Sequence, residues 1–155
     1  MKLKANRAVA GFETFPFMLV PVLIYNLLAY LAATPPGATE PPLLATMRGE
    51  AVAVPMLSGA SLSLSWGDLL LLLAIVCLLV EVIKATRTSA PAIINHMLSL
   101  GVFVLALVEF LLLPSFASST FFLLTMIVLL DAMAGMVVTI ISARRDFEVG
   151  GVAGS

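Results

Sequence analysis

The chain has few charged residues, one cysteine and one histidine. Of its 155 residues, 11% are charged, whereas a soluble domain has about 25%. One cysteine excludes a disulfide within the chain and a zinc site of paired thiolates. The sequence also shows no phosphate-binding glycine loop, no metal-ligand spacing and no nucleophile beside a base. We therefore expect a protein that is not an enzyme and holds no cofactor.

Apolar residues are abundant instead. They make up 61% of the chain, against roughly 45–50% in soluble domains, and the mean hydropathy is +1.15. Too few charges remain to cover a water-facing surface. This composition excludes a soluble globular domain, a disordered chain and a nucleic-acid-binding protein, so the sequence predicts an integral membrane protein in contact with the lipid bilayer.

Four apolar segments approach the roughly 20 residues that a helix needs to cross a hydrocarbon core. They cover residues 15–33, 69–85, 92–113 and 120–142. We predict one integral membrane domain over residues 1–155, of all-α class, folded as a four-transmembrane-helix bundle. The alternative, a signal peptide within the first 34 residues, is disfavoured because its apolar stretch is too long and lacks a small-x-small cleavage site.

The basic residues predict the orientation of these spans, because Lys and Arg are retained on the cytoplasmic side. In the four-span arrangement Arg48 alone lies on one side. The other seven basic residues lie on the opposite side: Lys2, Lys4, Arg7, Lys84, Arg87, Arg144 and Arg145. Both chain ends are therefore expected in the cytoplasm, and the long loop over residues 34–68 outside it.

Residues 50–66 of this loop predict a small β-hairpin. Large apolar residues alternate with small ones on both sides of Leu57-Ser58-Gly59, the period expected of strands. A three-residue turn with Gly59 in the left-handed conformation keeps the large side chains on one face. The predicted register places Val54 opposite Leu62 and Val52 opposite Leu64.

The apolar face of the predicted hairpin needs a partner, because an isolated hairpin is marginal in water. The partner is the outer ends of the helices, the lipid interface or another protein. A lid on the bundle is the structural interpretation. The functional interpretation is a docking surface formed by Val52, Val54, Leu62, Leu64 and Trp66. Trp66 also suits an interfacial anchor ahead of the second span, and Ser65 and Asp68 have the spacing of a capping box.

Asp131 is the most unusual polar residue of the spans because it lies near the expected bilayer midplane. An ionised carboxylate there costs a few kcal/mol even by low estimates. We expect Asp131 to be protonated, hydrogen-bonded or facing a polar interior. The candidate intramembrane polar site comprises Asp131, Asn26, Ser99 and Glu109. Depth along the spans makes a hydrogen bond between Asn26 and Asp131 a specific hypothesis.

Three other polar positions favour structural roles. Glu81 precedes Lys84 by three residues, so the two can neutralise each other on one helix face. Glu109 lies in the outer part of the third span, where it can extend toward the headgroups or meet the hairpin. His96, near the inner end of that span, is interpreted as hydrogen-bonded rather than as a ligand.

Five short segments carry a resemblance to known proteins: Gly67-Asp68-Leu69-Leu70-Leu71, Val108-Glu109-Phe110-Leu111, Ser119-Thr120-Phe121-Phe122-Leu123-Leu124, residues 131–135, and Ala143-Arg144-Arg145-Asp146. Over roughly residues 58–146, the chain resembles an uncharacterised group of small four-span bacterial membrane proteins. The resemblance implies the bacterial cytoplasmic (inner) membrane and no particular activity.

Two functions remain open. The first is a non-enzymatic interaction, accessory or assembly subunit, bound to another membrane protein or to a second copy of itself. The second is a small channel or transporter for protons, ions or solutes that uses Asp131. We favour the first because the sequence offers no cluster of reactive groups, and because small residues near Gly135 favour close helix packing.

Overall fold

The computed structural model describes residues 11–32, 34–85 and 90–152. The chain is mostly helical, with one two-stranded antiparallel sheet among these residues. The elements follow the order α2 (Leu19–Leu31), α3 (Pro42–Arg48), β1 (Glu50–Pro55), β2 (Ser61–Ser65), α4 (Trp66–Ala85), α5 (Ala90–Leu112), the 3₁₀ turn η1 (Pro114–Phe116) and α6 (Ser119–Val152).

Within the described residues, three helices are long and apolar enough to cross a membrane. They are Trp66–Ala85, Ile94–Leu112 and Ser119–Val137. Their bounds agree closely with three of the four spans expected from the sequence. These helices support an integral membrane protein.

The first apolar segment forms a shorter helix than the span that we predicted over residues 15–33. Residues 11–14 are helical, but the chain leaves the helix at Phe15 and resumes it only at Leu19. Pro16 explains the break, because proline has no N–H and disfavours helical backbone in the preceding residue. The resulting α2 has 13 residues and is about 20 Å long at 1.5 Å per residue.

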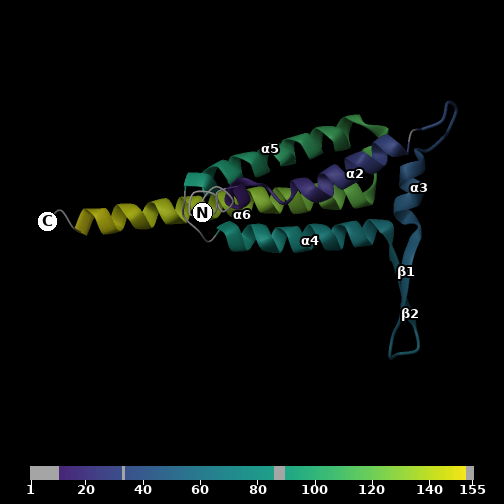
Figure 1. The fold of residues 1–155 in the computed structure, drawn as a ribbon, viewed down its shortest axis with the longest axis horizontal. Helices are drawn as coiled ribbons and strands as arrows, with labels where there is room; N and C mark the ends of the chain where they lie inside the picture. Colours follow the sequence, from purple (N-terminus) through teal and green to yellow (C-terminus); the bar gives the residue numbers. More distant parts are fainter. Residues whose placement is uncertain (1–10, 33, 86–89, 153–155) are drawn as a thin grey trace, which may run out of the picture.

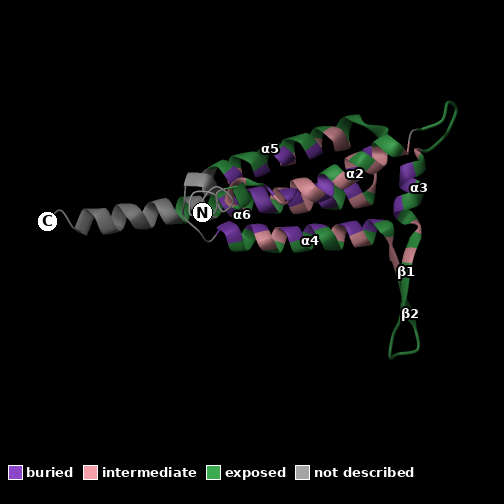
Figure 2. Ribbon diagram, viewed as in Figure 1, coloured by how far each residue is buried: buried purple, intermediate pink, exposed green. Residues whose placement is uncertain are grey.

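The four longer helices, α2, α4, α5 and α6, lie side by side and form what we call the helical body (Figure 1). α6 packs against both α4 and α5, while α2 contacts all three. Their shared core is apolar and includes Met18, Val22, Tyr25, Ala74, Ala106, Phe121, Leu124 and Val128. Many large apolar side chains of these helices are exposed. Exposed residues recur along each of these helices (Figure 2). That surface is suited to lipid rather than water.

The hairpin has the register that the sequence predicts. Val54 lies opposite Leu62 and Val52 opposite Leu64. Gly59 has a φ of 83°, the left-handed conformation expected in the turn. The Met56 amide closes the loop by donating to the Ala60 carbonyl oxygen at 2.9 Å.

The hairpin does not cover the helix ends as the lid interpretation expected. It extends away from the helical body, starting where α4 begins (Figure 1). The short helix α3 packs there instead, against α4 and η1, with Leu43, Leu44 and Met47 buried. Pro42 stands in the first turn of α3, where its missing N–H costs no hydrogen bond.

The junction between the hairpin and α4 is closed by the expected capping box. The Ser65 amide donates to Asp68 Oδ2 at 2.8 Å, and the Asp68 amide donates to Ser65 Oγ at 3.1 Å. The Trp66 amide also donates to the Gly49 carbonyl oxygen at 3.1 Å. Because β2 passes directly into α4, these bonds tie the base of the hairpin to the start of that helix.

Candidate functional site

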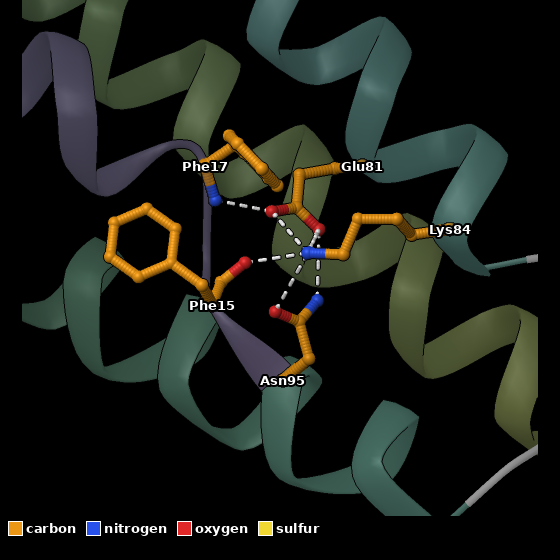
Figure 3. A network of polar contacts seen from close by, with 5 residues as sticks. All are labelled: Phe15, Phe17, Glu81, Lys84 and Asn95. Atoms are coloured by element: carbon orange, nitrogen blue, oxygen red, sulfur yellow. Dashed lines mark hydrogen bonds and ion pairs between the residues drawn. The ribbon is translucent and has the colours of Figure 1, made fainter. Parts of the chain in front are cut away.

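A buried charge cluster lies at the end of the helical body where α4 ends and α5 begins, which we call the basal end. It is formed by Glu81 and Lys84 of α4, Asn95 of α5, and the backbone of Phe15 and Phe17 (Figure 3). Glu81 and Lys84 are only 2% and 6% exposed. The ion pair expected from their spacing is therefore present, but it lies inside the protein rather than on its surface.

Each polar atom of this cluster faces a partner. Lys84 Nζ lies 3.1 Å from Glu81 Oε1 and donates to Asn95 Oδ1 at 3.3 Å. The amide of Asn95 donates to Glu81 Oε2 at 2.8 Å. The Lys84 ammonium group also lies 4.7 Å from the centre of the Phe17 ring, within range of a cation–π contact.

The cluster also compensates for the helix break at Pro16. Lys84 Nζ donates to the Phe15 carbonyl oxygen at 2.5 Å, and the Phe17 amide donates to Glu81 Oε1. A broken helix leaves backbone N–H and C=O groups that need other hydrogen-bond partners when they are buried. The buried ion pair supplies one donor and one acceptor for them.

Asp131 and Ser99 face each other across the interface of α6 and α5. Both side chains are buried, with 5% and 1% of their surface exposed. Neither Asp131 Oδ2 nor Ser99 Oγ completes a hydrogen bond in the described part of the chain. Glu81 and Lys84 act on Asp131 electrostatically, with opposite signs.

His96 lies one helical turn from this pair. Its ring fills the notch left by Gly135: a Cβ at Gly135 would lie 2.1 Å from His96 Nδ1. Gly135 follows Asp131 by four residues on α6, and His96 precedes Ser99 by three on α5, so the two pairs form successive layers of one interface. Because α5 rises from the basal end and α6 returns to it, the His96–Gly135 layer is the more basal one.

The hypothesis that Asn26 binds Asp131 is wrong. Asn26 Nδ2 donates to Glu109 Oε2 at 3.0 Å, and also to the Val22 carbonyl oxygen. The hypothesis placed Asn26 and Asp131 at a similar depth, which holds only if the first helix is unbroken from Phe15. The break at Pro16 instead moves α2, and Asn26 with it, toward the hairpin end. Glu109 therefore meets α2 rather than the hairpin.

The candidate docking surface is exposed, as its functional interpretation requires. Val52, Val54, Leu62 and Trp66 keep 43–53% of their surface exposed, and Leu64 is half-buried. The opposite face carries serines, and Ser63 Oγ donates to Glu50 Oε2 at 2.5 Å. The hairpin is therefore amphipathic, with one apolar face and one polar face.

The cavity beside Lys84 is smaller than a typical ligand pocket. One small, mostly apolar cavity of about 100 Å³ lies beside Lys84, lined by Phe12, Glu13, Val80 and Ile83. Ligand pockets usually enclose roughly 300–1,000 Å³. Among the described residues, no three His, Cys, Asp or Glu side chains are grouped as metal ligands.

Sequence reasoning identified Asp131, Ser99 and Glu109 as polar residues of interest but missed how the basal end is built. The participation of Asn95 and of the backbone at residues 15 and 17 was not predicted. Pro16 was the available signal, since a proline inside an apolar segment frees backbone groups that need partners. No protein-family model, curated protein or solved structure matches the chain.

Proposed function

We propose that this chain is a non-enzymatic four-span membrane protein that acts as an interaction, accessory or assembly subunit. In this proposal its hairpin binds a neighbouring protein in the same membrane. The observation that carries the proposal is an apolar hairpin face that stands beside the helical body instead of packing on it (Figure 1). A two-stranded hairpin gains little stability alone, so this face requires a partner.

The path of the first apolar segment supports four crossings. Phe12 lies 5.8 Å from Lys84 Nζ at the basal end, while Tyr25 donates to the Ser115 carbonyl oxygen at the hairpin end. The segment thus runs the length of the helical body despite its break. Four crossings leave both chain ends on the side of the basic residues, which is the cytoplasmic side by the distribution of Lys and Arg.

The direction of the hairpin favours a protein partner within the membrane plane. The two strands run across the direction of the helices, starting from Trp66 at the first turn of α4 (Figure 1). They would therefore lie along the membrane surface, beside the helical body. Both edges of a two-stranded sheet are unpaired and can accept another strand. Pro55 lacks an N–H on β1, which makes β2 the better edge.

Site-specific photo-crosslinking in native membranes tests this proposal. A photoreactive residue at Val54 should link to one protein, whereas the same residue at Ser61, on the opposite face, should not. Leu62→Asp should reduce the Val54 product on the order of tenfold or more, because it places a charge within the apolar contact. A second copy of the chain as the product identifies self-association. Lipid adducts alone from both positions would contradict the proposal.

Transport is a second candidate, favoured by one observation. Asp131 is a buried carboxyl group whose Oδ2 has no hydrogen-bond partner among the described residues. Ionisable residues within spans often mark proton or ion pathways. Liposome flux of protons or alkali cations that is lost in Asp131→Asn would support transport, and absence of flux in the wild type would exclude it.

A further inference from the structure

We infer that Asp131 and Ser99 form a buried proton-binding site, which exchanges its proton with the basal end past His96. The starting observation is a facing pair of polar groups that are more than nine-tenths buried and unsatisfied. A buried hydroxyl or carboxyl group without a partner costs several kcal/mol in hydrocarbon. The Ser99 hydroxyl can donate to an ionised Asp131, but the carboxylate charge would then stay buried. One added proton removes that charge and keeps the hydrogen bond, because a protonated Asp131 can donate from Oδ2 to Ser99 Oγ.

Among the described residues, the neighbouring charges do not offer an alternative counter-ion. Lys84 is the cation that acts on Asp131, but its three protons already have Glu81, Asn95 and the Phe15 carbonyl oxygen as acceptors. Glu81 acts on Asp131 with the opposite sign to Lys84, so the electrostatic effects of the two charges on the Asp131 carboxyl group largely cancel. α2 carries no charged side chain. An ionised Asp131 would therefore be an uncompensated charge within the helical body.

A proton fits this site better than a metal cation. Sodium and calcium ions need a shell of several oxygen ligands, about six to eight for calcium. Only Asp131 Oδ2 and Ser99 Oγ are buried side-chain polar atoms without a partner in the described residues. A proton needs one donor and one acceptor, which is what these two atoms provide.

His96 is placed to exchange the proton. Its ring lies against Gly135 in the layer directly basal to Asp131 and Ser99, and it is only half-buried. Imidazole accepts and returns a proton near neutral pH more readily than any other unperturbed side chain. The contact depends on Gly135, because a side chain there would displace the ring. The Glu81–Lys84 pair lies on α4, which also packs against α6.

Infrared spectroscopy of the full chain in lipid nanodiscs tests the inference. At neutral pH the wild type should show the carbonyl band of a protonated carboxylic acid. Asp131→Asn should remove that band, and Ser99→Ala should move it to higher frequency by deleting the acceptor. Glu40→Gln, a change to an exposed surface carboxylate, is the matched control and should leave the band unchanged.

The exchange step has its own readout. When the medium is changed to D₂O, His96→Gln should slow the isotope shift of the acid band on the order of tenfold or more. An unchanged exchange rate would overturn the role of His96. Absence of the acid band from the wild type at neutral pH would overturn the site, and that measurement does not depend on a variant folding. Loss of the band in Glu109→Gln rather than in Asp131→Asn would assign the proton elsewhere.

The inference goes beyond the interaction function and is independent of it. It shares Asp131 with the transport candidate, but proton binding does not require flux. An acid band without liposome flux would leave the proton site standing while excluding transport. The crosslinking experiment at the hairpin can fail or succeed without affecting either result.

Discussion

Lys84 is held in the interior of this protein by acceptors from three different parts of the chain. Glu81 neutralises its charge, Asn95 bridges the pair, and the Phe15 carbonyl oxygen accepts its third proton. Removing two charges from water costs several kcal/mol per ion, which a single contact rarely offsets. Lys84 and Glu81 also bond the Phe15 carbonyl oxygen and the Phe17 amide, which the helix break at Pro16 leaves without helical partners. The cluster therefore stabilises the path that the chain takes through this break.

Lys84→Met should destabilise the protein by about 3–5 kcal/mol, because it leaves the Glu81 carboxylate buried without a cation. The Phe15 carbonyl oxygen would lose its donor as well. The free energy of unfolding in mixed micelles measures the effect. Arg48→Ala is the control: its 2.8 Å pair with Glu40 is exposed, and exposed pairs contribute roughly 0–1 kcal/mol.

Replacing both partners of the buried pair sharpens this prediction. Glu81→Met combined with Lys84→Met should recover part of the lost stability, since no single buried charge remains. Recovery should be incomplete because the backbone groups of Phe15 and Phe17 still lack partners. A Lys84→Met variant as stable as the Arg48→Ala control would contradict the role assigned to the cluster.

At the residue scale, the sequence predicts contacts within one helix better than contacts between helices. The Glu81–Lys84 pair followed from a spacing of three residues on one helix. The Asn26–Asp131 bond was wrong because depth depends on where a helix starts, and Pro16 moves that start to Leu19. The contribution of Asn95 depends on the relative register of α4 and α5, which no local pattern encodes.

At the element scale, Gly67 fixes how closely three elements meet at the base of the hairpin. A Cβ at Gly67 would lie 2.4 Å from Thr120 Oγ1 and 3.0 Å from the Met47 carbonyl oxygen. The Met47 backbone lies on one side of this Cβ position, and Thr120 in the first turn of α6 lies on the other. Neither neighbour has much room to move away from an added methyl group. The start of α4, the end of α3 and the start of α6 therefore pack on this position.

Gly67→Ala should destabilise the protein by about 1–3 kcal/mol, the usual cost of overpacking. Gly101→Ala is the matched control, because a Cβ there meets nothing within 4 Å and alanine favours a helix by up to about 1 kcal/mol. Unfolding in mixed micelles compares the two. Equal stability of both variants would show that the junction is looser than its distances imply.

Gly59→Ala should loosen the hairpin turn without affecting the helical body. The left-handed conformation of Gly59 costs an L-residue roughly 1–2 kcal/mol. Hydrogen exchange at the Met56 amide, which closes the turn, should therefore accelerate about fivefold or more. Unchanged exchange at that amide would indicate that the turn does not depend on glycine.

The hairpin also shows where prediction from sequence stops at this scale. Its register was predictable because alternation and turn length act within some fifteen residues. Its position was not, because the direction of the strands is set by the capping box and by the packing of α3 at the same end. The short helix that follows Pro41 was not predicted either, because prolines surround its start.

At the scale of the whole molecule, the polar features divide between the two ends of the helical body. The buried charge cluster and the His96–Gly135 layer lie toward the basal end, and the amphipathic hairpin leaves from the other. The segment from Phe12 to α2 connects the two ends beside α4, α5 and α6. Whether that broken segment crosses the bilayer decides on which side the hairpin and the chain ends lie.

Cysteine accessibility in intact cells measures this directly. Replacing the buried Cys77 by Ala gives a background into which single cysteines are placed at Ala5, at Ser58 in the hairpin turn and at Ser155. Four crossings predict that a membrane-impermeant maleimide labels position 58 alone in intact cells, and all three positions after lysis. Labelling of position 5 together with position 58, but not of position 155, would show three crossings and contradict the account.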